Sequence, residues 1–514
     1  MTAQVRTSRS VTTSDYAEFS TGSLGFIQRH ELWTEEQRSA AQRVLQEIEE
    51  LDLVRVAFGD PHGLVRSKTL TPSAFQTAMR NGMDFSAGPF VFDTGHAVAI
   101  DFFAEGGGIG IPELTGAGDF IIVPDPCTFL VLPYADARIG WVIGDEYLRN
   151  GDPHPLSSRA ALRRTVDQLI PQSLEYLVGI EVEWYLTRYV TGPHDGTVGD
   201  FGSPGEPPRV TPVDRGYQFN SDLLTDQLTA VLAPLARAVQ DAGLPLRTIE
   251  HESGPGQIEF TFSPMSGLAA ADAMLLFRTI AKQVCTRHGY HASFMTLPAI
   301  DGFDASGWHL HQSLFDLRAG RNAFCVDEPG QLLSPLGRHY LGGLLEHAPE
   351  STLLGVPTIN GYRRLNERFS LSPDRITWSP ENRGAFVRVL GGYGEPSTHL
   401  ENRVGEPCAN PYLYLTAQLA AGLDGVRRQL EPGEPALDPH TTEARRLPTD
   451  LGAAIDSFST SSLYRTILGN HLFTALLALK RSELSRYTEW EKANGGQPPG
   501  VATEWEHREY FGVY

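Results

Sequence analysis

The first periodic pattern of apolar and polar positions along the chain predicts an amphipathic helix over residues 35–50. Val44, Leu45 and Ile48 recur at helical spacing, and Thr34 with Gln37 makes the capping-box pattern that begins a helix. Residues 1 to about 30 are rich in Ser and Thr and lack periodic apolar positions. We therefore expect an N-terminal arm over residues 1–34 that is flexible or depends on a partner.

Short strand patterns follow this helix. Apolar runs at 51–58 and 64–70 flank a Pro/Gly turn at 59–63, which predicts a β-hairpin. Further short strands are expected at 120–123, 128–132 and 140–144. Together these elements predict a small α+β domain over residues 35–150, which ends at the turn-rich stretch 150–155.

Beyond this stretch the pattern predicts a larger second domain over residues 151–514. Ser157 or Ser158 is placed to cap a helix that runs to about residue 172. Strands and amphipathic helices then alternate to residue 514, interrupted by a Gly/Pro-rich insertion at about 191–216. The fold class is therefore α+β.

One expected strand, at residues 179–184, carries two acids inside an apolar run. Because side chains alternate along a strand, Glu181 and Glu183 project from the same face. Two carboxylates on an apolar face repel each other and lose hydration, so a cation such as a metal ion is expected to compensate them. The alternative is a half-solvated strand whose acidic face points to water.

Composition narrows the classes of function. The chain has 514 residues, of which 41% are hydrophobic and 20% charged, as in soluble globular proteins. A formal net charge of −20 and a pI of about 5.2 argue against a nucleic-acid surface, which needs clustered Lys and Arg. We expect neither a membrane segment nor a signal peptide, and four scattered cysteines indicate a reduced, cytoplasmic setting.

Two further segments place polar residues at strand spacing. Glu259 lies in the alternating run 257–262, and Glu252 precedes a Gly-Pro-Gly turn that can fold it back toward the same place. For these two acids, charge that faces solvent remains the alternative. His309 and His311 share one face of the strand expected within 306–314. Imidazole and carboxylate groups together are ligands for ions such as Mn²⁺, so the segments predict a metal site.

Arginines follow on the later segments. Arg364, Arg383, Arg388 and Arg403 lie in or beside strand-like runs, and Arg403 comes two residues after Glu401. Arginine is rarely buried without an anionic partner. Glutamates, histidines and arginines on successive strands indicate a cleft for metal ions and a polyanion, which fits phosphoryl transfer. No Walker-type or kinase-like glycine-rich loop is present, so we do not expect a P-loop.

From about residue 35 onward, the chain resembles the glutamine synthetase family. The resemblance implies an N-terminal β-grasp domain followed by a catalytic domain with a curved antiparallel sheet. It also implies a homo-oligomer of stacked rings, a dodecamer, whose active sites lie between neighbouring subunits. Six motifs occur in that family's order: G-x-E-x-E, E…G-Q-x-E, S-G-x-H-x-H-Q-S, N-x-Y-x-R-L, N-R…x-R and E-x-R…A-N-P-Y.

The resemblance also assigns a reaction and residue roles. ATP phosphorylates the γ-carboxylate of glutamate, and an amine then displaces phosphate, with two or more Mg²⁺ or Mn²⁺ ions in each site. The implied sets are Glu183, Glu252 and Glu259 for one ion; Glu181, His309 and Glu401 for the second; Arg364 and Arg403 for glutamate; Arg383 and Arg388 for the transferred phosphoryl group; His311 and Ser313 for the nucleotide; and Asp84 for the acceptor.

Three places depart from the pattern of true glutamine synthetases. The flap that carries a glutamate in that family reads N-E-R-F-S-L over 366–371, with Ser370-Leu371 where the glutamate is expected. The ammonium-site motif is preserved only at Asp84 and one serine, and an insertion-like run at 88–93 follows it. His399 stands where most members have an arginine.

The spacing of Glu252 and Glu259 and the form of the segment 401–403 resemble the branch that joins glutamate to larger amines such as polyamines or ethanolamine, whereas His399 departs from both branches. A bulkier acceptor needs room and apolar contact, which Phe85, Phe90 and Leu371 can supply. We therefore expect an ATP-dependent ligase that joins the γ-carboxylate of glutamate to an amine larger than ammonia. The alternatives are an ordinary glutamine synthetase that uses ammonium and a catalytically weak, nucleotide-binding ring protein.

Glu401→Gln tests the ligand set of the second ion. The change removes a ligand carboxylate but leaves a neutral group of the same shape, so we expect phosphoryl transfer to be lost while the fold stays intact. Release of phosphate from ATP measures the first effect, and far-UV circular dichroism measures the second. An unchanged rate of phosphate release contradicts the role implied for Glu401.

Overall fold

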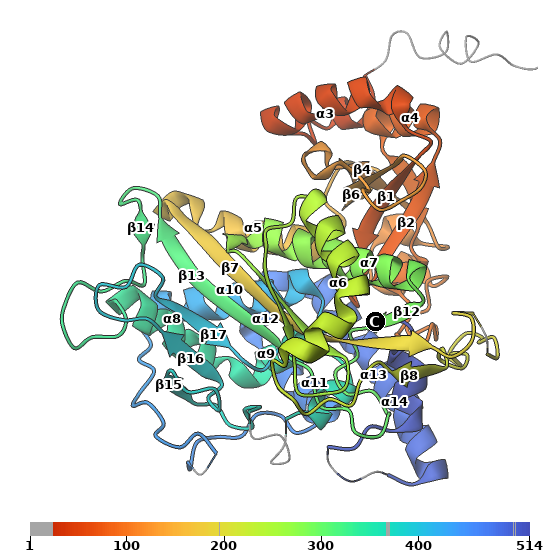
Figure 1. Cartoon of the computed structure of the whole chain (residues 1–514). Helices are drawn as coiled ribbons and strands as arrows, with labels where there is room; N and C mark the ends of the chain where they lie inside the picture. The colour runs from red at the N-terminus through yellow and green to blue at the C-terminus, as the bar shows by residue number, and fades with distance from the viewer. Residues whose placement is uncertain (1–23, 195, 366–370, 441, 497, 499) are drawn as a thin grey trace, which may run out of the picture.

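The computed structural model describes residues 24–194, 196–365, 371–440, 442–496, 498 and 500–514. A six-stranded sheet is built from residues 53–147, and an eleven-stranded sheet from residues 174–402. Helices and strands are both abundant and the larger sheet is curled (Figure 1), which confirms the expected α+β class. Within these ranges, none of the helices combines the length and the apolar character that crossing a bilayer requires.

The smaller sheet contains the predicted helix and hairpin. α3 (Glu35–Glu47) begins at Thr34, and both halves of the capping box with Gln37 are formed. β1 (Leu53–Gly59) and β2 (Val65–Leu70) pair antiparallel, which confirms the hairpin. α2 (Phe26–Arg29), α3 and α4 (Pro72–Asn81) lie above this sheet in Figure 1. The sheet order is β2-β1-β6-β4-β3 with β5 beside β6, and the remaining strands are β3 (Met83–Ser86), β4 (Asp119–Pro124), β5 (Leu130–Val131) and β6 (Ile139–Tyr147).

Two predicted elements are shorter in the structure. β5 does not begin at residue 128, because Asp125 caps a turn of 3-10 helix there. α5 (Ser158–Asp167) is capped by Ser157 and ends before residue 172, since Pro171 lies in a separate 3-10 turn and has no N–H to continue the helix. The 3-10 helices are Ile48–Glu50, Gly88–Phe90, Glu105–Gly108, Pro112–Leu114, Pro126–Thr128, Ile170–Gln172 and Asn360–Arg363.

β7 (Leu174–Tyr189) is the central strand of the larger sheet. β13 (Trp308–Asp316) pairs with it antiparallel on one side and β10 (Gln257–Phe262) on the other. Only β15 and β16 pair in parallel among the described strands of this sheet, so the expected antiparallel sheet is confirmed except at its edge. The other strands are β8 (Val210–Pro212), β9 (Leu246–His251), β11 (Met265–Ser266), β12 (Tyr290–Ser293), β14 (Arg321–Asn322), β15 (Trp378–Pro380), β16 (Val387–Leu390) and β17 (His399–Asn402).

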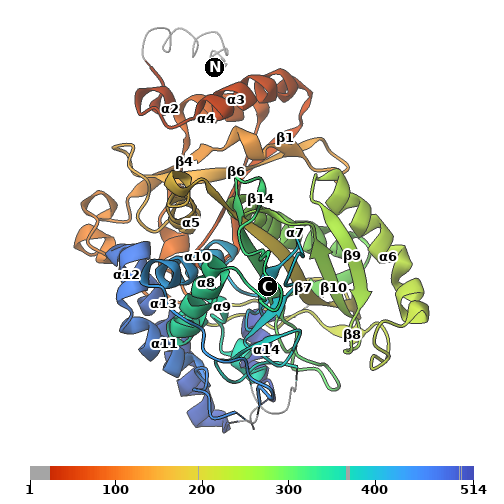
Figure 2. The same cartoon turned by 90° about the vertical axis from the view of Figure 1, so that its left-hand side faces the viewer.

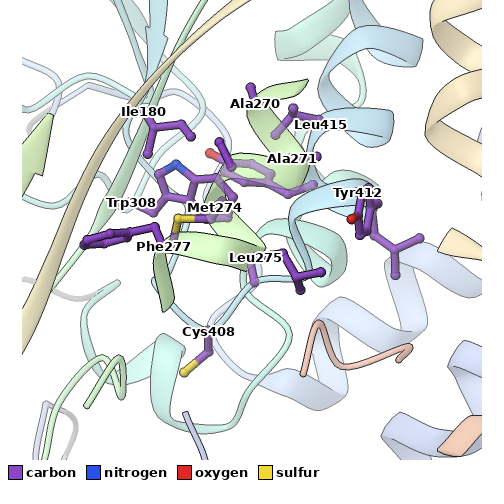
Figure 3. Close-up of a cluster of buried hydrophobic side chains, with 14 of the residues drawn as sticks. Ile180, Ala270, Ala271, Met274, Leu275, Phe277, Trp308, Cys408, Tyr412 and Leu415 are labelled. Carbon is purple, nitrogen blue, oxygen red and sulfur yellow. The ribbon is translucent and has the colours of Figure 1, made fainter. Parts of the chain in front are cut away.

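One face of the larger sheet packs on helices and forms the main core. Ile180 on β7 and Trp308 on β13 are almost completely buried against α7 (Gly267–Arg287) and α10 (Pro411–Arg428). Figure 3 shows both side chains facing Met274 and Phe277 of α7. Because side chains alternate along each strand, the residues between these apolar positions point to the opposite face of the sheet.

The other helices lie around the larger sheet. In Figure 2, α8, α9, α11, α12 and α13 gather on one side of the molecule, away from α6. Their bounds are α6 (Asp222–Asp241), α8 (Pro335–Glu346), α9 (Ala348–Gly355), α11 (Leu451–Ser459), α12 (Ser462–Leu468), α13 (Asn470–Asn494) and α14 (Glu504–Tyr510).

Arg159 on α5 joins the two sheets through buried ion pairs. Its guanidinium lies 3.0 Å from Asp125, 2.6 Å from Asp145 and 2.7 Å from Asp272 of α7. Arg163 adds a contact of 3.0 Å to Asp145. Asp125 and Asp145 belong to the smaller sheet and its loops, so one buried cation fixes that sheet against α7.

Replacing Arg159 by Met keeps most of the side-chain volume but removes the cation that three carboxylates share, and leaves Arg163 as the remaining cation beside Asp145. We expect the free energy of unfolding to fall by about 3–5 kcal/mol, because a buried charge that loses its partner is strongly destabilising. Urea denaturation measures the change. Arg38→Met, which breaks an exposed pair with Glu35, is the control and should cost less than about 1 kcal/mol. Equal losses in the two variants contradict the joining role of Arg159.

Candidate active site

The polar face of the larger sheet lines a cavity of about 1450 Å³. The side chains of β7, β10 and β13 that do not enter the core form its floor. Loops around residues 217–219, 303–305 and 394–399 form its walls. Such a volume is large enough to hold a nucleotide and a second small molecule together.

The strand register brings the predicted acids and histidines together on this face. His309 of β13 lies opposite Glu181 of β7, and Glu259 of β10 lies opposite Glu183 of β7. Residues paired across neighbouring strands have side chains on the same face. The four side chains therefore form two adjacent rows across the cavity floor.

Two histidines bind Glu181. His309 Nδ1 lies 2.6 Å from Glu181 Oε1, and His311 Nε2 lies 3.0 Å from Glu181 Oε2. Burial opposes ionisation, but hydrogen bonds from the two imidazoles hold the pKa of Glu181 well below its usual range. His311 Nδ1 lies 2.9 Å from Nε2 of His399. His399 is thus linked to the acid cluster through His311.

Neutral donors orient Glu183. Gly307 N donates to Glu183 Oε2 at 2.9 Å, and Gln257 Nε2 donates to the same oxygen at 3.0 Å. A Cβ at Gly307 would lie 2.6 Å from Arg364 Nη2. Glycine at this position therefore allows the backbone to pass between Glu183 and Arg364.

The carboxyls around Glu183 are hard to ionise together. Burial and the nearby Glu252 raise the pKa of Glu183 to about 8. Burial and the neighbouring carboxylates raise the pKa of Glu259 to about 10, and burial with Glu250 raises that of Glu252 to about 7. Carboxylates in this arrangement need a positive partner, which supports a divalent ion here.

Two groups of side chains offer ligand atoms that lie within 4.8 Å of one another. One is Glu181, His309 and Glu401, and the other is Glu183, Glu259 and His309. Carboxylate oxygens with one imidazole suit Mg²⁺ or Mn²⁺. Glu252 lines the same cavity but lies outside both groups. The residues present therefore fit divalent ions on either side of His309.

Arg364 and Arg403 place positive charge on the cavity wall. Arg364 Nη2 lies 3.2 Å from His309 Nε2 and donates to the carbonyl oxygen of Arg403 at 3.0 Å. Burial lowers the pKa of Arg364 to about 10, which leaves its guanidinium charged at neutral pH. Arg403 forms an ion pair with Glu401. Both arginines line the cavity and suit a substrate carboxylate.

Glu401 lies fully buried between two arginines, Arg403 and Arg388. Arg388 Nη1 lies 3.2 Å from Glu401 Oε2, and Arg388 Nη2 lies 2.7 Å from Glu381. Burial opposes the charge of Glu401, but Arg403 lowers its pKa. Glu401→Gln would leave Arg403 without its anion, so we expect a loss of about 1–3 kcal/mol in stability beside the loss of activity.

The remaining predicted residues of the larger sheet differ in their access to the cavity. His311, Ser313 and Arg383 line it, whereas Arg388 and its partner Glu401 do not belong to the described residues that line it. Ser370 and the rest of the flap over 366–370 lie outside the described residues. Leu371 lines the cavity and is exposed.

Asp84 lies away from this cavity, on β3 of the smaller sheet. Its carboxylate lies 3.0 Å from Arg149 Nη2, and both side chains are more than half exposed. Phe85 packs edge-on against Phe58, and Phe90 is buried in the core of the smaller sheet. Within a single chain, the described residues that line the cavity include neither phenylalanine, so the apolar contacts expected from them are not made there.

Some residues that shape the cavity had no role in the sequence-based prediction. Gln257 and Gly307 orient Glu183; both belong to the motifs G-Q-x-E and S-G-x-H-x-H-Q-S, but those motifs gave neither residue a role. Glu250 lies opposite Glu259 across β9 and β10. Tyr217 and Phe219 lie on the cavity wall. The feature of the sequence that could have identified them is a pair of aromatic residues just after the Gly/Pro-rich insertion.

Comparison with known families decides the class of protein. The family described as "Glutamine synthetase, catalytic domain" matches residues 155–494. The chain belongs to the glutamine synthetase family. Members of this family are ATP-dependent ligases that join an amine to glutamate and use divalent metals. The protein is therefore an enzyme of the ATP-dependent carbon–nitrogen ligase class, as the six motifs indicate.

Individual relatives within the family differ in the amine. A gamma-glutamylanilide synthase from Acinetobacter sp. is 41% identical over 500 residues, which cover 95% of this chain and 99% of that protein. A glutamine synthetase from Archaeoglobus fulgidus is 31% identical over 438 residues, with coverage of 77% and 85%. A solved structure described as a GmaS/ADP complex has a TM-score of 0.71 at 27% identity and covers 89% of this chain and 99% of its own.

The raised carboxyl pKa values predict how pH and divalent ions act on stability. When the pKa of an acid rises on folding, the protein loses folding stability as the pH increases from the acid's usual pKa toward its pKa in the folded state. Without divalent ions, the protein should therefore become less stable from about pH 6 to about pH 9, and Mn²⁺ should remove that loss. Because the ion displaces protons from Glu183 and Glu259, its apparent Kd should fall about tenfold per pH unit for each proton released. Differential scanning and titration calorimetry measure both effects.

Glu259→Gln isolates the contribution of one carboxylate. At about pH 8 the folded protein holds a proton on Glu259, whose pKa is about 10, whereas the unfolded chain does not. The neutral amide removes this cost of protonation, so the variant should melt above the wild type when no divalent ion is added. Mn²⁺ should stabilise the variant less than the wild type. Glu47→Gln, at an exposed position on α3, is the control and should change neither result. A Glu259→Gln variant with the full Mn²⁺ response contradicts the ion site.

Proposed function

We propose that this enzyme is a glutamate–arylamine ligase, which uses ATP to join the γ-carboxylate of glutamate to a neutral aromatic amine. The observation that carries the proposal is the 41% identity to gamma-glutamylanilide synthase over 99% of that relative. The motif resemblance led us to expect polyamines or ethanolamine, which are cationic at neutral pH. An aromatic amine differs from them in being largely uncharged.

The acceptor end of the protein fits a neutral amine. The family's flap glutamate, which helps to deprotonate ammonium, is replaced by Ser370-Leu371. Asp84, the acid that resembles the ammonium site, is paired with Arg149 at 3.0 Å. An aromatic amine is a weak base whose free form dominates at neutral pH. It therefore needs neither a carboxylate to attract it nor a base to deprotonate it before attack.

We further propose that the acid cluster holds two Mg²⁺ or Mn²⁺ ions. Bound there, the ions supply positive charge beside the phosphates of ATP and stabilise the phosphoryl group in transfer. His311 and Ser313 would contact the nucleotide. The proposed ligands are Glu181, His309 and Glu401 for the ion on the ATP phosphates, and Glu183, Glu252 and Glu259 for the ion near glutamate and the acceptor.

In the first step, a γ-carboxylate oxygen of glutamate attacks the γ-phosphorus of ATP, and ADP leaves. Arg364 and Arg403 bind the carboxylates of glutamate and orient it for this attack. Arg383, on the cavity wall, and Arg388 would stabilise charge on the transferred group. Through its contact of 3.2 Å, Arg388 also fixes the orientation of Glu401.

In the second step, the amine nitrogen attacks the acyl carbon of γ-glutamyl phosphate, and phosphate leaves. The attacking nitrogen becomes cationic and strongly acidic, so it loses its proton after the new bond has begun to form. A dedicated base is therefore not essential for this acceptor. The sequence has Ser370-Leu371 where the flap glutamate is expected, which agrees with this order of events.

We also propose that the enzyme acts in the cytoplasm as a homo-oligomer of stacked rings, a dodecamer. In this arrangement the β-grasp domain of one copy, residues 35–150, covers the cavity in the catalytic domain of the next, residues 151–514. Asp84 supports this proposal, because it lies outside the cavity of its own chain although it resembles an acceptor-site residue. Analytical ultracentrifugation tests the assembly.

A panel of amines with ATP, Mg²⁺ and glutamate tests the proposed reaction. We expect aniline to stimulate phosphate release and to yield a γ-glutamyl anilide detected by mass spectrometry. Ammonium, putrescine and ethanolamine should have kcat/KM values at least about tenfold lower. Benzylamine has the same ring but a strongly basic nitrogen, so it is cationic at neutral pH. Comparing it with aniline shows whether the enzyme selects the ring or the absence of charge.

The outcomes of the panel distinguish the alternatives. If ammonium alone stimulates phosphate release, the enzyme is an ordinary glutamine synthetase. Tight ATP binding without turnover of any amine indicates a catalytically weak, nucleotide-binding ring protein. Benzylamine turnover equal to that of aniline contradicts the preference for a neutral amine.

A further inference from the structure

The segment Asp214–Asn220, called the aromatic loop below, forms part of the cavity wall beside the acid cluster. Tyr217 and Phe219 line the cavity together with Glu252. Tyr217 is 57% exposed and Phe219 is 62% exposed, although aromatic side chains of this size are usually well covered. The loop therefore presents an uncovered apolar surface to the cavity.

The aromatic loop is bound to the turn between β9 and β10. Asp214 Oδ2 lies 2.8 Å from Nε2 of His251, and both side chains are buried. Tyr217 N donates to the carbonyl oxygen of Ser253 at 2.5 Å, and Asn220 N donates to that of His251 at 2.9 Å. Because this turn carries one of the cavity acids, the contacts fix the aromatic rings relative to the acid cluster.

The backbone of the aromatic loop has left-handed residues on both sides of Phe219. Tyr217, with φ of 58°, is strained because tyrosine rarely adopts this region, whereas Asn220, with φ of 52°, is of a type that tolerates it. Tyr217 Oη donates to the carbonyl oxygen of Gly302 at 2.8 Å, which ties its ring to the neighbouring loop. Phe219 has no polar atom that could anchor it in this way. Its place on the cavity wall is set by the backbone, and strain of this kind is typical of binding sites.

We propose that Phe219 is a specificity-determining residue on which the ring of the aromatic amine stacks. The buried pair of Asp214 and His251 positions it beside the acid cluster. The proposal rests on the arylamine ligase function proposed above and adds the residue that selects the ring. Aromatic rings interact favourably in offset or edge-to-face geometry, which an amine without a ring cannot reproduce. Phe219 therefore acts on acceptor binding.

Phe201 offers a comparison within the same chain, because a single exposed aromatic residue is common on protein surfaces. It is 68% exposed, and its ring contacts Phe92 with centroids 5.6 Å apart. Phe201 does not belong to the described residues that line the cavity. Phe219 differs from it in facing the cavity and in lying between two left-handed residues.

The test compares two amines that are both largely neutral at about pH 8, aniline and hydroxylamine, of which only aniline has a ring. Phe219→Ala should lower the ratio of kcat/KM for aniline to that for hydroxylamine about tenfold, mainly through a higher KM for aniline. Phe219→Trp should restore most of the ratio, since it replaces one aromatic face by another. Phe201→Ala should retain the wild-type ratio. Mass spectrometry quantifies the anilide and the hydroxamate.

The outcomes separate this proposal from the ligase function. If the wild type forms the anilide and Phe219→Ala leaves the ratio unchanged, the stacking role is wrong and the arylamine ligase function stands. If the wild type forms the hydroxamate but no anilide, both proposals are wrong. An equal fall with both amines indicates a structural role for Phe219 and also overturns the proposal.

Discussion

One electrostatic constraint governs the cavity: the carboxyls of Glu183, Glu252 and Glu259 lie too close together, and too deep, to ionise without positive charge. Their raised pKa values express the same constraint, since each proton removed adds a charge that neighbouring carboxylates oppose. The low polarity of a buried site strengthens this repulsion and equally strengthens the attraction of a bound cation. This face of the sheet therefore needs protons or a bound cation, and the proposed divalent ions would supply the positive charge.

The sheet imposes a second constraint, because its two faces cannot be altered independently. On β7, Ile180 enters the core while Glu181 and Glu183 line the cavity. A shift of one residue in register would exchange these faces and bury two carboxylates among apolar side chains. Trp308, packed against α7 in Figure 3, helps to hold β13 in the register that places His309 opposite Glu181. Packing on one face thus positions the polar side chains on the other.

The two ends of the proposed reaction are built differently. At the end proposed to activate glutamate, Glu181, Glu183 and Arg364 place charged side chains in the cavity, and activation of a carboxylate does not depend on which nucleophile follows. The acceptor end has Ser370-Leu371 in its flap and Phe219 on its wall, and Asp84 is paired with Arg149. Loss of charge at this end alone changes the amine without changing the first step. This separation explains how one fold can serve ligases with different acceptors.

Much of the fold and part of the candidate site follow from local patterns in the sequence. Thr34 and Gln37 mark the start of α3, and alternation at residues 179–184 and 306–314 is enough to place Glu181, Glu183, His309 and His311 on strand faces. These predictions succeed because capping and period-two alternation depend on neighbouring residues. The shortened β5 and α5 show the limit of such rules, since a 3-10 turn capped by Asp125 delays the start of β5 and Pro171 prevents α5 from continuing to residue 172.

Contacts between distant segments were decided only by the tertiary structure. The sequence alone determined the family's motifs, the types of ligand residue and the altered flap. It did not determine that His309 lies beside both acid groups, that Arg388 pairs with the buried Glu401, or that Phe90 is buried in the smaller sheet. Nor did it reveal Phe219, whose orientation depends on the strained backbone of the aromatic loop and on its attachment to the β9–β10 turn. Strand register and loop docking bring together residues far apart in the chain, and local sequence patterns carry no information about either.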